Sequence, residues 1–156
     1  MRTRITIGMF MALAVLMWPV CATAQALDND QFKLISQEVL DQYSNSLLTE
    51  DMQLFKSVHA EDMIKLMPGR PVIIGLEQEA QNKANAFNNG AFKSFDSLVE
   101  EAEVYGEIGF CRGTLSYILV LDSGKGNVEF SGKFLMILKK DADGSWKIYR
   151  GCFNSP

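Results

Sequence analysis

Residues 128–153 read VEFSGKFLMILKKDADGSWKIYRGCF, and this stretch decides the fold because it predicts a β-hairpin. Its first half carries apolar side chains at alternate positions from Phe130 to Leu138, which is the period of a strand. Asp141-Ala142-Asp143-Gly144 is typical of a turn, since Asp bonds to its own backbone and Gly tolerates positive φ. We therefore expect two antiparallel strands, at residues 128–140 and 145–153.

The residues before this hairpin extend it into a meander. Two more strand-like runs occupy residues 97–105 and 109–122, and a loop of small and polar residues at 123–127 leads into the hairpin. Short loops join strands that run antiparallel, so the second half of the chain predicts a four-stranded antiparallel meander. The acidic run formed by Glu100, Glu101 and Glu103 is expected to face solvent on an edge strand.

The first half of the chain has helical periodicity. Asp28-Asn29-Asp30-Gln31 forms a capping box, and apolar residues then recur every three or four positions on one helix face: Phe32, Ile35, Val39, Tyr43 and Leu47. Beyond it we expect a short helix at 51–59, short strands at 63–67 and 72–74, and a third helix at 76–87. Helices followed by a meander predict an α+β fold with the helices on one face of the sheet.

The chain begins with the features of a secretory signal peptide over residues 1–26. Two arginines precede an apolar run at residues 5–20, and small residues follow it. Cleavage is expected after Ala24 or Ala26, which leaves residues 27–156 as one periplasmic or secreted domain without a stable membrane anchor. The alternative, an uncleaved anchor, is disfavoured because the run is short for a membrane span and contains a helix-breaking proline.

The charge balance excludes two classes of partner. The whole chain has a formal net charge of −4, and removal of the first 26 residues, with two arginines and no acid, makes it about −6. Nucleic acids and anionic membrane surfaces require a basic face, so neither is an expected partner. No metal or cofactor is expected, because the chain has one histidine and no spacing typical of metal ligands.

Two cysteines remain after the predicted cleavage, Cys111 and Cys152. Pairing the strands through their loops places Cys111 opposite Lys139, and Lys139 opposite Lys147. Cys152 then lies about five residues further along, with a strand between, which exceeds the Cα separation of about 7 Å that a disulfide allows. We predict two free thiols and no disulfide.

Several short stretches, taken in order, carry a resemblance to a known family. They are Ala60-Glu61-Asp62-Met63, Pro68-Gly69 through Ile74-Gly75, Tyr105 to Gly109, Ser131 to Leu135, and Asp143 to Arg150 with Asn154-Ser155. The chain resembles the nuclear transport factor 2-like superfamily, in its SnoaL-like branch. This implies a cone: a strongly curved antiparallel sheet wrapped around three N-terminal helices, with a pocket at the open end. The fold hosts isomerases, cyclases, dehydratases, binding proteins and assembly modules, so fold alone does not imply function.

The resemblance also supplies a test for catalysis. Ketosteroid isomerases of this superfamily use a carboxylate base just before the proline and a tyrosine donor on the first helix. Tyr43 matches the tyrosine, but Met67 stands before Pro68 and cannot accept a proton, which disfavours that mechanism. His59 and Tyr43 remain catalytic candidates, although packing is the preferred role of each. Asp62 is interpreted as a turn-stabilising carboxylate.

The expected pocket is mainly apolar and aromatic. Its predicted lining is Tyr43, Met67, Phe87, Phe110, Arg112, Phe134, Met136, Trp146, Arg150 and Asn154. Arg112 and Arg150 are placed on the sheet face of Trp146, where they can meet an anionic group or reach the rim. Such a pocket suits a small hydrophobic or amphipathic ligand, bound without catalysis.

Two other functions stay open. One is a SnoaL-like isomerase, cyclase or dehydratase that acts on a hydrophobic carbonyl compound. The other is a dimerisation or assembly module, because Leu135 and Ile137 make the second face of the sheet partly apolar. A homodimer through this sheet face is therefore expected.

Overall fold

The computed structural model describes residues 27–122, 124 and 126–155, so the predicted signal peptide lies outside the described residues. The helices are α1 (Asn29–Leu48), α2 (Met52–Ser57) and α3 (Leu76–Phe87). The strands are β1 (His59–Leu66), β2 (Ile73–Ile74), β3 (Gly90–Tyr105), β4 (Ile108–Leu121), β5 (Asn127–Lys140) and β6 (Trp146–Asn154). Within this described part, no helix has both the length and the apolar character that crossing a membrane requires.

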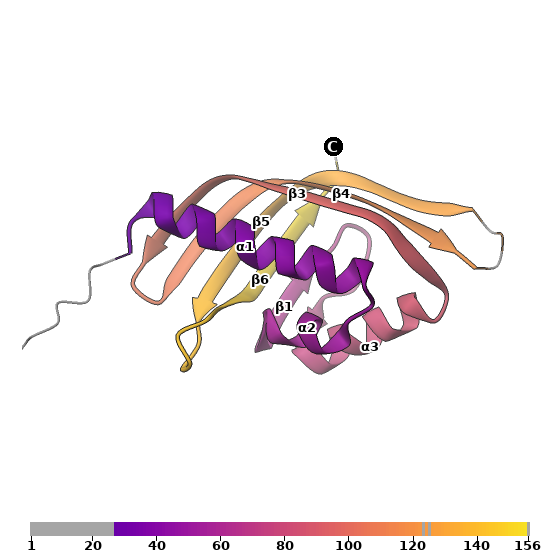
Figure 1. Cartoon of the computed structure of the whole chain (residues 1–156), viewed down its shortest axis with the longest axis horizontal. Coiled ribbons are helices and arrows are strands. Elements are labelled where there is room, and N and C mark those ends of the chain that lie inside the picture. The colour runs from indigo at the N-terminus through magenta and orange to yellow at the C-terminus, as the bar shows by residue number, and fades with distance from the viewer. Residues whose placement is uncertain (1–26, 123, 125, 156) are drawn as a thin grey trace, which may run out of the picture.

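The strands form one six-stranded sheet in the order β2-β1-β6-β5-β4-β3. β3 to β6 pair antiparallel in succession, which confirms the predicted meander. β1 pairs parallel with β6 and antiparallel with β2, so the sheet as a whole is mixed. The long strands arch over α1, while α2 and α3 lie near β1 at one end of the domain (Figure 1). This arrangement confirms the α+β class.

α1 begins where the capping pattern predicts and buries the face that its apolar spacing predicts. The Asp28 side chain accepts a hydrogen bond of 2.8 Å from the Gln31 N–H, which satisfies a free donor of the first turn. Phe32 and Leu47 are fully buried, and the Phe32 ring packs edge-on against Trp146 with centroids 4.8 Å apart. The backbone of Gly109 passes beneath this ring. A Cβ at Gly109 would lie 2.3 Å from Phe32, so any other residue there would force the ring to shift.

Two strands begin earlier than predicted. β3 begins at Gly90 rather than at residue 97, because a register shift between Phe92 and Ser94 breaks the two-residue period that marks a strand. β1 begins at His59 rather than at residue 63, because α2 ends at Ser57. His59 therefore belongs to a strand and not to the end of the short helix.

The predicted register is right for one hairpin and wrong for the other. Lys139 faces Lys147 as predicted, but Cys111 faces Met136 instead of Lys139. β4 and β5 pair from Val120 opposite Asn127, both earlier in the chain than the expected strand ends at residues 122 and 128. The partner of Cys111 therefore moves by three positions, from Lys139 to Met136. Both thiols are free: Cys111 is buried in the core, Cys152 is exposed, and β5 lies between their strands.

Candidate functional site

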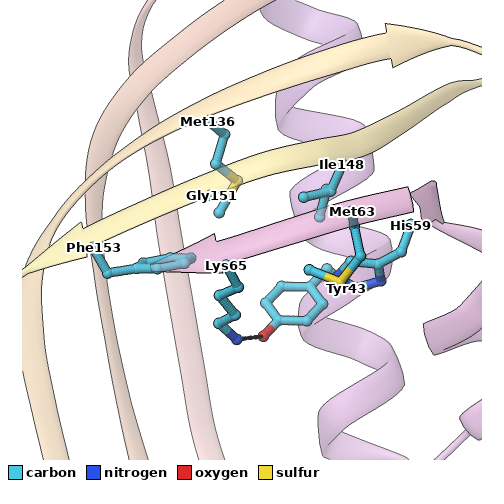
Figure 2. Close-up of a pocket in the computed structure, with 8 residues that line it drawn as sticks. All are labelled: Tyr43, His59, Met63, Lys65, Met136, Ile148, Gly151 and Phe153. Atoms are coloured by element: carbon cyan, nitrogen blue, oxygen red, sulfur yellow. Dashed lines mark hydrogen bonds between the residues drawn. The ribbon is translucent and has the colours of Figure 1, made fainter. Parts of the chain in front are cut away.

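The space between α1 and the concave face of the sheet is almost completely filled. Two small cavities remain there, and Tyr43, Lys65 and Phe153 line both of them. In the inner cavity, the centre of a water molecule can occupy a volume of about 10 Å³. Its other walls are His59, Met63, Met136, Ile148 and Gly151 (Figure 2). The outer cavity has about 30 Å³, and its other walls are Met67, Lys83, Phe92, Phe95, Leu115, Tyr117 and Phe130. Each has room for about one or two water molecules.

A buried ion pair stands at the wall between these cavities. Lys65 comes from β1, and its Nζ donates a hydrogen bond of 2.8 Å to Glu79 Oε1 on α3. Only 9% of the Lys65 side chain and 2% of the Glu79 side chain are exposed, so both charges are removed from water. The same Glu79 oxygen lies 3.6 Å from Nζ of Lys83, one helical turn further along α3. The pair therefore ties β1 to α3 with charged groups.

The two partners keep each other ionised. Burial opposes the ammonium form of Lys65, but Tyr43 and Glu79 outweigh it and raise the pKa of Lys65 above its ordinary value. Burial likewise opposes the Glu79 carboxylate, but the charges of Lys65 and Lys83 outweigh it and lower the pKa of Glu79. Lys65 is thus a cation and hydrogen-bond donor at neutral pH, and not an amine nucleophile.

Tyr43 points from α1 into the same region. Its hydroxyl oxygen lies 3.5 Å from Lys65 Nζ, from which it accepts a long hydrogen bond (Figure 2). Its ring packs edge-on against Phe95 and His59, each with centroids 5.3 Å apart. This packing holds the hydroxyl of the predicted donor at the cavity wall beside a cation.

His59 lines the inner cavity but is a weak base. Burial lowers the pKa of His59 to about 4, against the opposing effect of its hydrogen bond to the Phe55 carbonyl. That bond joins Nδ1 to the carbonyl oxygen at 2.7 Å, so Nδ1 is the protonated nitrogen of a neutral ring. Its remaining nitrogen, Nε2, is then an acceptor with little affinity for a proton.

No carboxylate lines either cavity among the residues that the structure describes. Met67, the residue before Pro68, forms part of the outer wall. Asp62 is exposed, and its backbone carbonyl accepts a hydrogen bond of 2.9 Å from Arg150. The arrangement can donate hydrogen bonds to an oxygen atom, but its proton acceptors are poor.

Six of the ten predicted lining residues lie on the inner side of the fold. Tyr43, Met67 and Met136 line the cavities, Phe134 and Trp146 belong to the buried core, and Phe87 packs at its edge. The other four, Phe110, Arg112, Arg150 and Asn154, do not line either cavity. Their prediction as pocket residues was wrong.

The error on β4 follows from its register. The buried residues of β4 are Gly109, Cys111, Gly113 and Leu115, so Phe110 and Arg112 face outward. Because side chains alternate along a strand, the shift by three positions against β5 exchanges the two faces. Arg112 instead forms an exposed ion pair with Glu100 at 2.7 Å and a second with Glu101.

The error on β6 follows from an irregularity in its pairing. The register shifts opposite Ile137 and Leu138, so that Tyr149 is an extra residue between Ile148 and Arg150. Trp146, Ile148, Gly151 and Phe153 are therefore buried, whereas Arg150 and Asn154 face the other way. The Arg150 guanidinium stacks on the Tyr149 ring at 3.4 Å.

Sequence reasoning missed Lys65 and Glu79. Lys65 does stand between Met63 and Met67 at two-residue spacing, so it occupies an inward position of a strand, where a lysine is unusual. Glu79 stands beside Ala80, which belongs to the inward stripe of α3. A charged residue at an inward position of each element could have indicated the site. Nothing in the sequence, however, shows that Lys65 and Glu79 pair with each other.

Comparison with solved structures shows the architecture clearly. A conserved protein from Planctomyces limnophilus is 19% identical with a TM-score of 0.74, over 81% of this chain and 99% of that chain. A ketosteroid isomerase-like protein from Erwinia carotovora is 18% identical with a TM-score of 0.68, over 81% and 99%. A nuclear transport factor 2-like superfamily protein from Salmonella enterica is 17% identical with a TM-score of 0.69, over 81% and 92%.

These likenesses concern the fold, because the identities are low. No protein-family model matches the chain, and no curated protein matches it. The six-stranded curved sheet, the three helices before and beside it and the solved structures agree with one another. The chain therefore has the nuclear transport factor 2-like fold.

Proposed function

We propose that the protein binds a small amphipathic ligand between α1, α3 and the concave face of the sheet, without catalysis. One observation carries the proposal: Lys65 Nζ and the Tyr43 hydroxyl stand together at two cavities whose other walls are mostly apolar or aromatic. Ligand sites commonly combine such walls with a few convergent polar groups.

The ligand needs more room than the two cavities offer. Small-molecule sites enclose about 300–1,000 Å³, so binding has to widen the outer cavity. Widening is expected at the side chains around the outer cavity, because the buried Lys65–Glu79 pair keeps α3 attached to β1. Met67 and Lys83, which are partly exposed, form the mouth. The ligand enters between these side chains and the aromatic wall of β3 and β4.

The weakness of the available bases supports binding over catalysis. Loss of a positioned general base costs about 10²–10⁴ in rate, and Met67 stands where the family has its carboxylate. His59 has a pKa of about 4 because burial disfavours its charged form, and it is a poor substitute.

A cavity-filling variant tests the proposal. Met67→Trp fills the mouth of the outer cavity, whereas Leu98→Trp adds the same side chain on the exposed outer face of β3. Melting temperatures are measured with a panel of aromatic and short-chain amphipathic compounds. The proposal predicts that a compound stabilises the native protein and Leu98→Trp but not Met67→Trp. Failure of every compound at about 1 mM to stabilise the native protein would overturn it, since this concentration detects even weak binding.

A second candidate is an isomerase, cyclase or dehydratase acting on a hydrophobic carbonyl compound. It is favoured by the presence of Tyr43 and His59 in the wall of one cavity. Tyr43 would donate to the carbonyl oxygen, and His59 Nε2 would accept the proton. The test substrate is a β,γ-unsaturated ketone, whose double bond can move into conjugation with the carbonyl group. Turnover that is abolished equally in Tyr43→Phe and His59→Asn supports this function. Turnover that is unchanged in both variants rules it out.

Export and dimerisation are further proposals. We propose cleavage near Ala24 or Ala26, to be checked by mass spectrometry of the N-terminus of the exported protein. We also propose a homodimer through the outer sheet face, where Leu66 on β1 and Leu135 on β5 are exposed on either side of Cys152 on β6. Light scattering of the native protein and of Leu135→Glu tests this: a monomer in both cases rules the dimer out.

A further inference from the structure

The Lys65 ammonium has hydrogen-bonding capacity that the folded chain leaves unused. An ammonium carries three N–H donors. One is taken by Glu79 Oε1 at 2.8 Å, and a second makes only the long contact of 3.5 Å with the Tyr43 oxygen. The Phe153 ring lies 5.3 Å from the nitrogen, and no further oxygen acceptor occurs among the described residues. At least one N–H is therefore free to bind an incoming oxygen.

The Tyr43 hydroxyl provides a second unused hydrogen-bond donor, beside the free N–H of Lys65. Its oxygen accepts from Lys65, and within residues 27–122, 124 and 126–155 no group accepts the hydroxyl proton. Because Lys65 and Tyr43 line both cavities and their polar atoms lie 3.5 Å apart, both donors can reach the same incoming group. Two converging donors, one of them charged, are suited to a carboxylate oxygen.

The local charge has the sign that such a group requires. Two ammonium groups, Lys65 and Lys83, surround one carboxylate, Glu79, and the nearby His59 is neutral. The cluster therefore carries about one net positive charge, although the whole chain is acidic. Because these side chains are largely removed from water, that charge is weakly screened and acts strongly on a bound anion.

The aromatic wall indicates the shape of the rest of the ligand. Phe95 and Tyr117 are stacked with their ring planes 2° apart, and Tyr117 and Phe130 are stacked at 15°. These rings form a continuous row along the outer cavity. A ligand ring can pack edge-to-face or offset-stacked on any of these rings, and this favours an aromatic body.

We infer that the ligand of this site is a small aromatic monocarboxylate, whose carboxylate binds Lys65 Nζ and the Tyr43 hydroxyl while its ring packs along Phe95, Tyr117 and Phe130. The inference rests on the proposed binding function and names the ligand class of the same site. Glu79 keeps its hydrogen bond and holds Lys65 in position. Lys83 at the mouth attracts the anion as it enters.

Isothermal titration with matched probes tests the inference. The probes are 2-naphthoate, its neutral isostere 2-naphthamide and the cation 2-naphthylmethylammonium. We expect 2-naphthoate to bind at least about tenfold more tightly than the amide, as a charge-assisted hydrogen bond predicts, and the cation to bind weakest. Lys65→Met should remove this preference while the affinity for the amide stays constant. The control Lys56→Met removes an exposed lysine, also paired with a glutamate on α3, and should leave the preference unchanged.

The outcomes separate the two proposals. Equal affinity for 2-naphthoate and 2-naphthamide overturns the carboxylate inference and leaves the binding function standing. Absence of binding by all three probes, in a protein that binds none of the wider panel, overturns both. If Lys65→Met does not fold, Tyr43→Phe decides, because it removes one oxygen and keeps the ring. A loss of about three- to tenfold, confined to 2-naphthoate, supports the inference; an unchanged affinity contradicts it.

Discussion

Lys65 Nζ and Glu79 Oε1, 2.8 Å apart, form an ion pair that is almost entirely removed from solvent. Desolvation of two charges costs about as much as their attraction returns, so a buried pair is weak evidence for stability. An apolar pair of similar volume would pack in the same place. The charges stand beside Tyr43 and two cavities, as the proposed ligand site requires.

Variants of this pair should be strongly non-additive. Glu79→Leu leaves Lys65 buried without a counter-ion and should lower the free energy of unfolding by about 3–5 kcal/mol. Lys65→Met should cost less, because Lys83 remains 3.6 Å from Glu79. The double variant should lie within about 1 kcal/mol of the native protein, since no unpaired buried charge is left. Urea unfolding measures all three, and additive losses would contradict the account.

The fold was predictable from the sequence where local signals agree. The turn at Asp141–Gly144 sets Lys139 opposite Lys147, and the apolar spacing of α1 marks its buried face. The loop at 122–126 has no such unique signal, because several of its residues suit a turn. A slip by three positions there reverses the faces of β4 and moves Arg112 from the expected pocket to the outer surface.

The candidate site was less predictable because it depends on long-range contacts. Tyr43 was found because it stands on the inward stripe of α1, and Met67 because the resemblance singles out the residue before Pro68. The pairing of Lys65 with Glu79 joins a strand to a helix, and no periodicity connects the two. The extra residue Tyr149 in β6 likewise follows from pairing with β5 and not from its own composition.

His59 should make stability depend on pH. Its pKa is lowered from 6.5 in the unfolded chain to about 4 by burial, so the unfolded state binds more protons between these values. Stability should rise as pH increases from 4 to 6.5 and level off above it, with a total change of about 3 kcal/mol. His59→Asn retains a donor for the Phe55 carbonyl and should remove this slope. Urea unfolding at pH 4.5, 5.5, 6.5 and 7.5 measures it, and an unchanged slope in the variant would assign the effect to other groups.

Arg112 should have no part in ligand binding. It lies on the outer face of β4 and pairs with Glu100 and Glu101, all three partly exposed. Arg112→Ala should therefore leave the affinity for 2-naphthoate unchanged and lower the melting temperature only slightly. Titration and thermal unfolding of the same preparation check both. A tenfold loss of affinity would mean that Arg112 contacts the ligand, which would contradict the register of β4 against β5.

The two cysteines should differ sharply in reactivity. Burial raises the pKa of the Cys111 thiol to about 12, against the opposing effect of a hydrogen bond with Ser36, whereas Cys152 is exposed. Iodoacetamide should modify Cys152 in the folded Leu135→Glu variant, in which the proposed dimer face stays open, and Cys111 only after unfolding, because the thiolate is the reactive form. Peptide mass spectrometry identifies each site separately. Equal labelling of both under native conditions would show that β4 opens readily.

Gly109 and Phe32 should be coupled, because the ring of Phe32 occupies the space where a side chain at position 109 would begin. Gly109→Ala places its Cβ 2.3 Å from that ring and should cost about 1–3 kcal/mol of stability through overpacking. Phe32→Leu alone should also destabilise, since it leaves a cavity beside Trp146. In the double variant the new methyl group partly fills that cavity, so its loss should be smaller than the sum of the single losses. A double-mutant cycle by urea unfolding measures the difference, and simple additivity would mean that the strain at Gly109 comes from the Glu103 carbonyl, 2.8 Å from the same Cβ position, rather than from the ring.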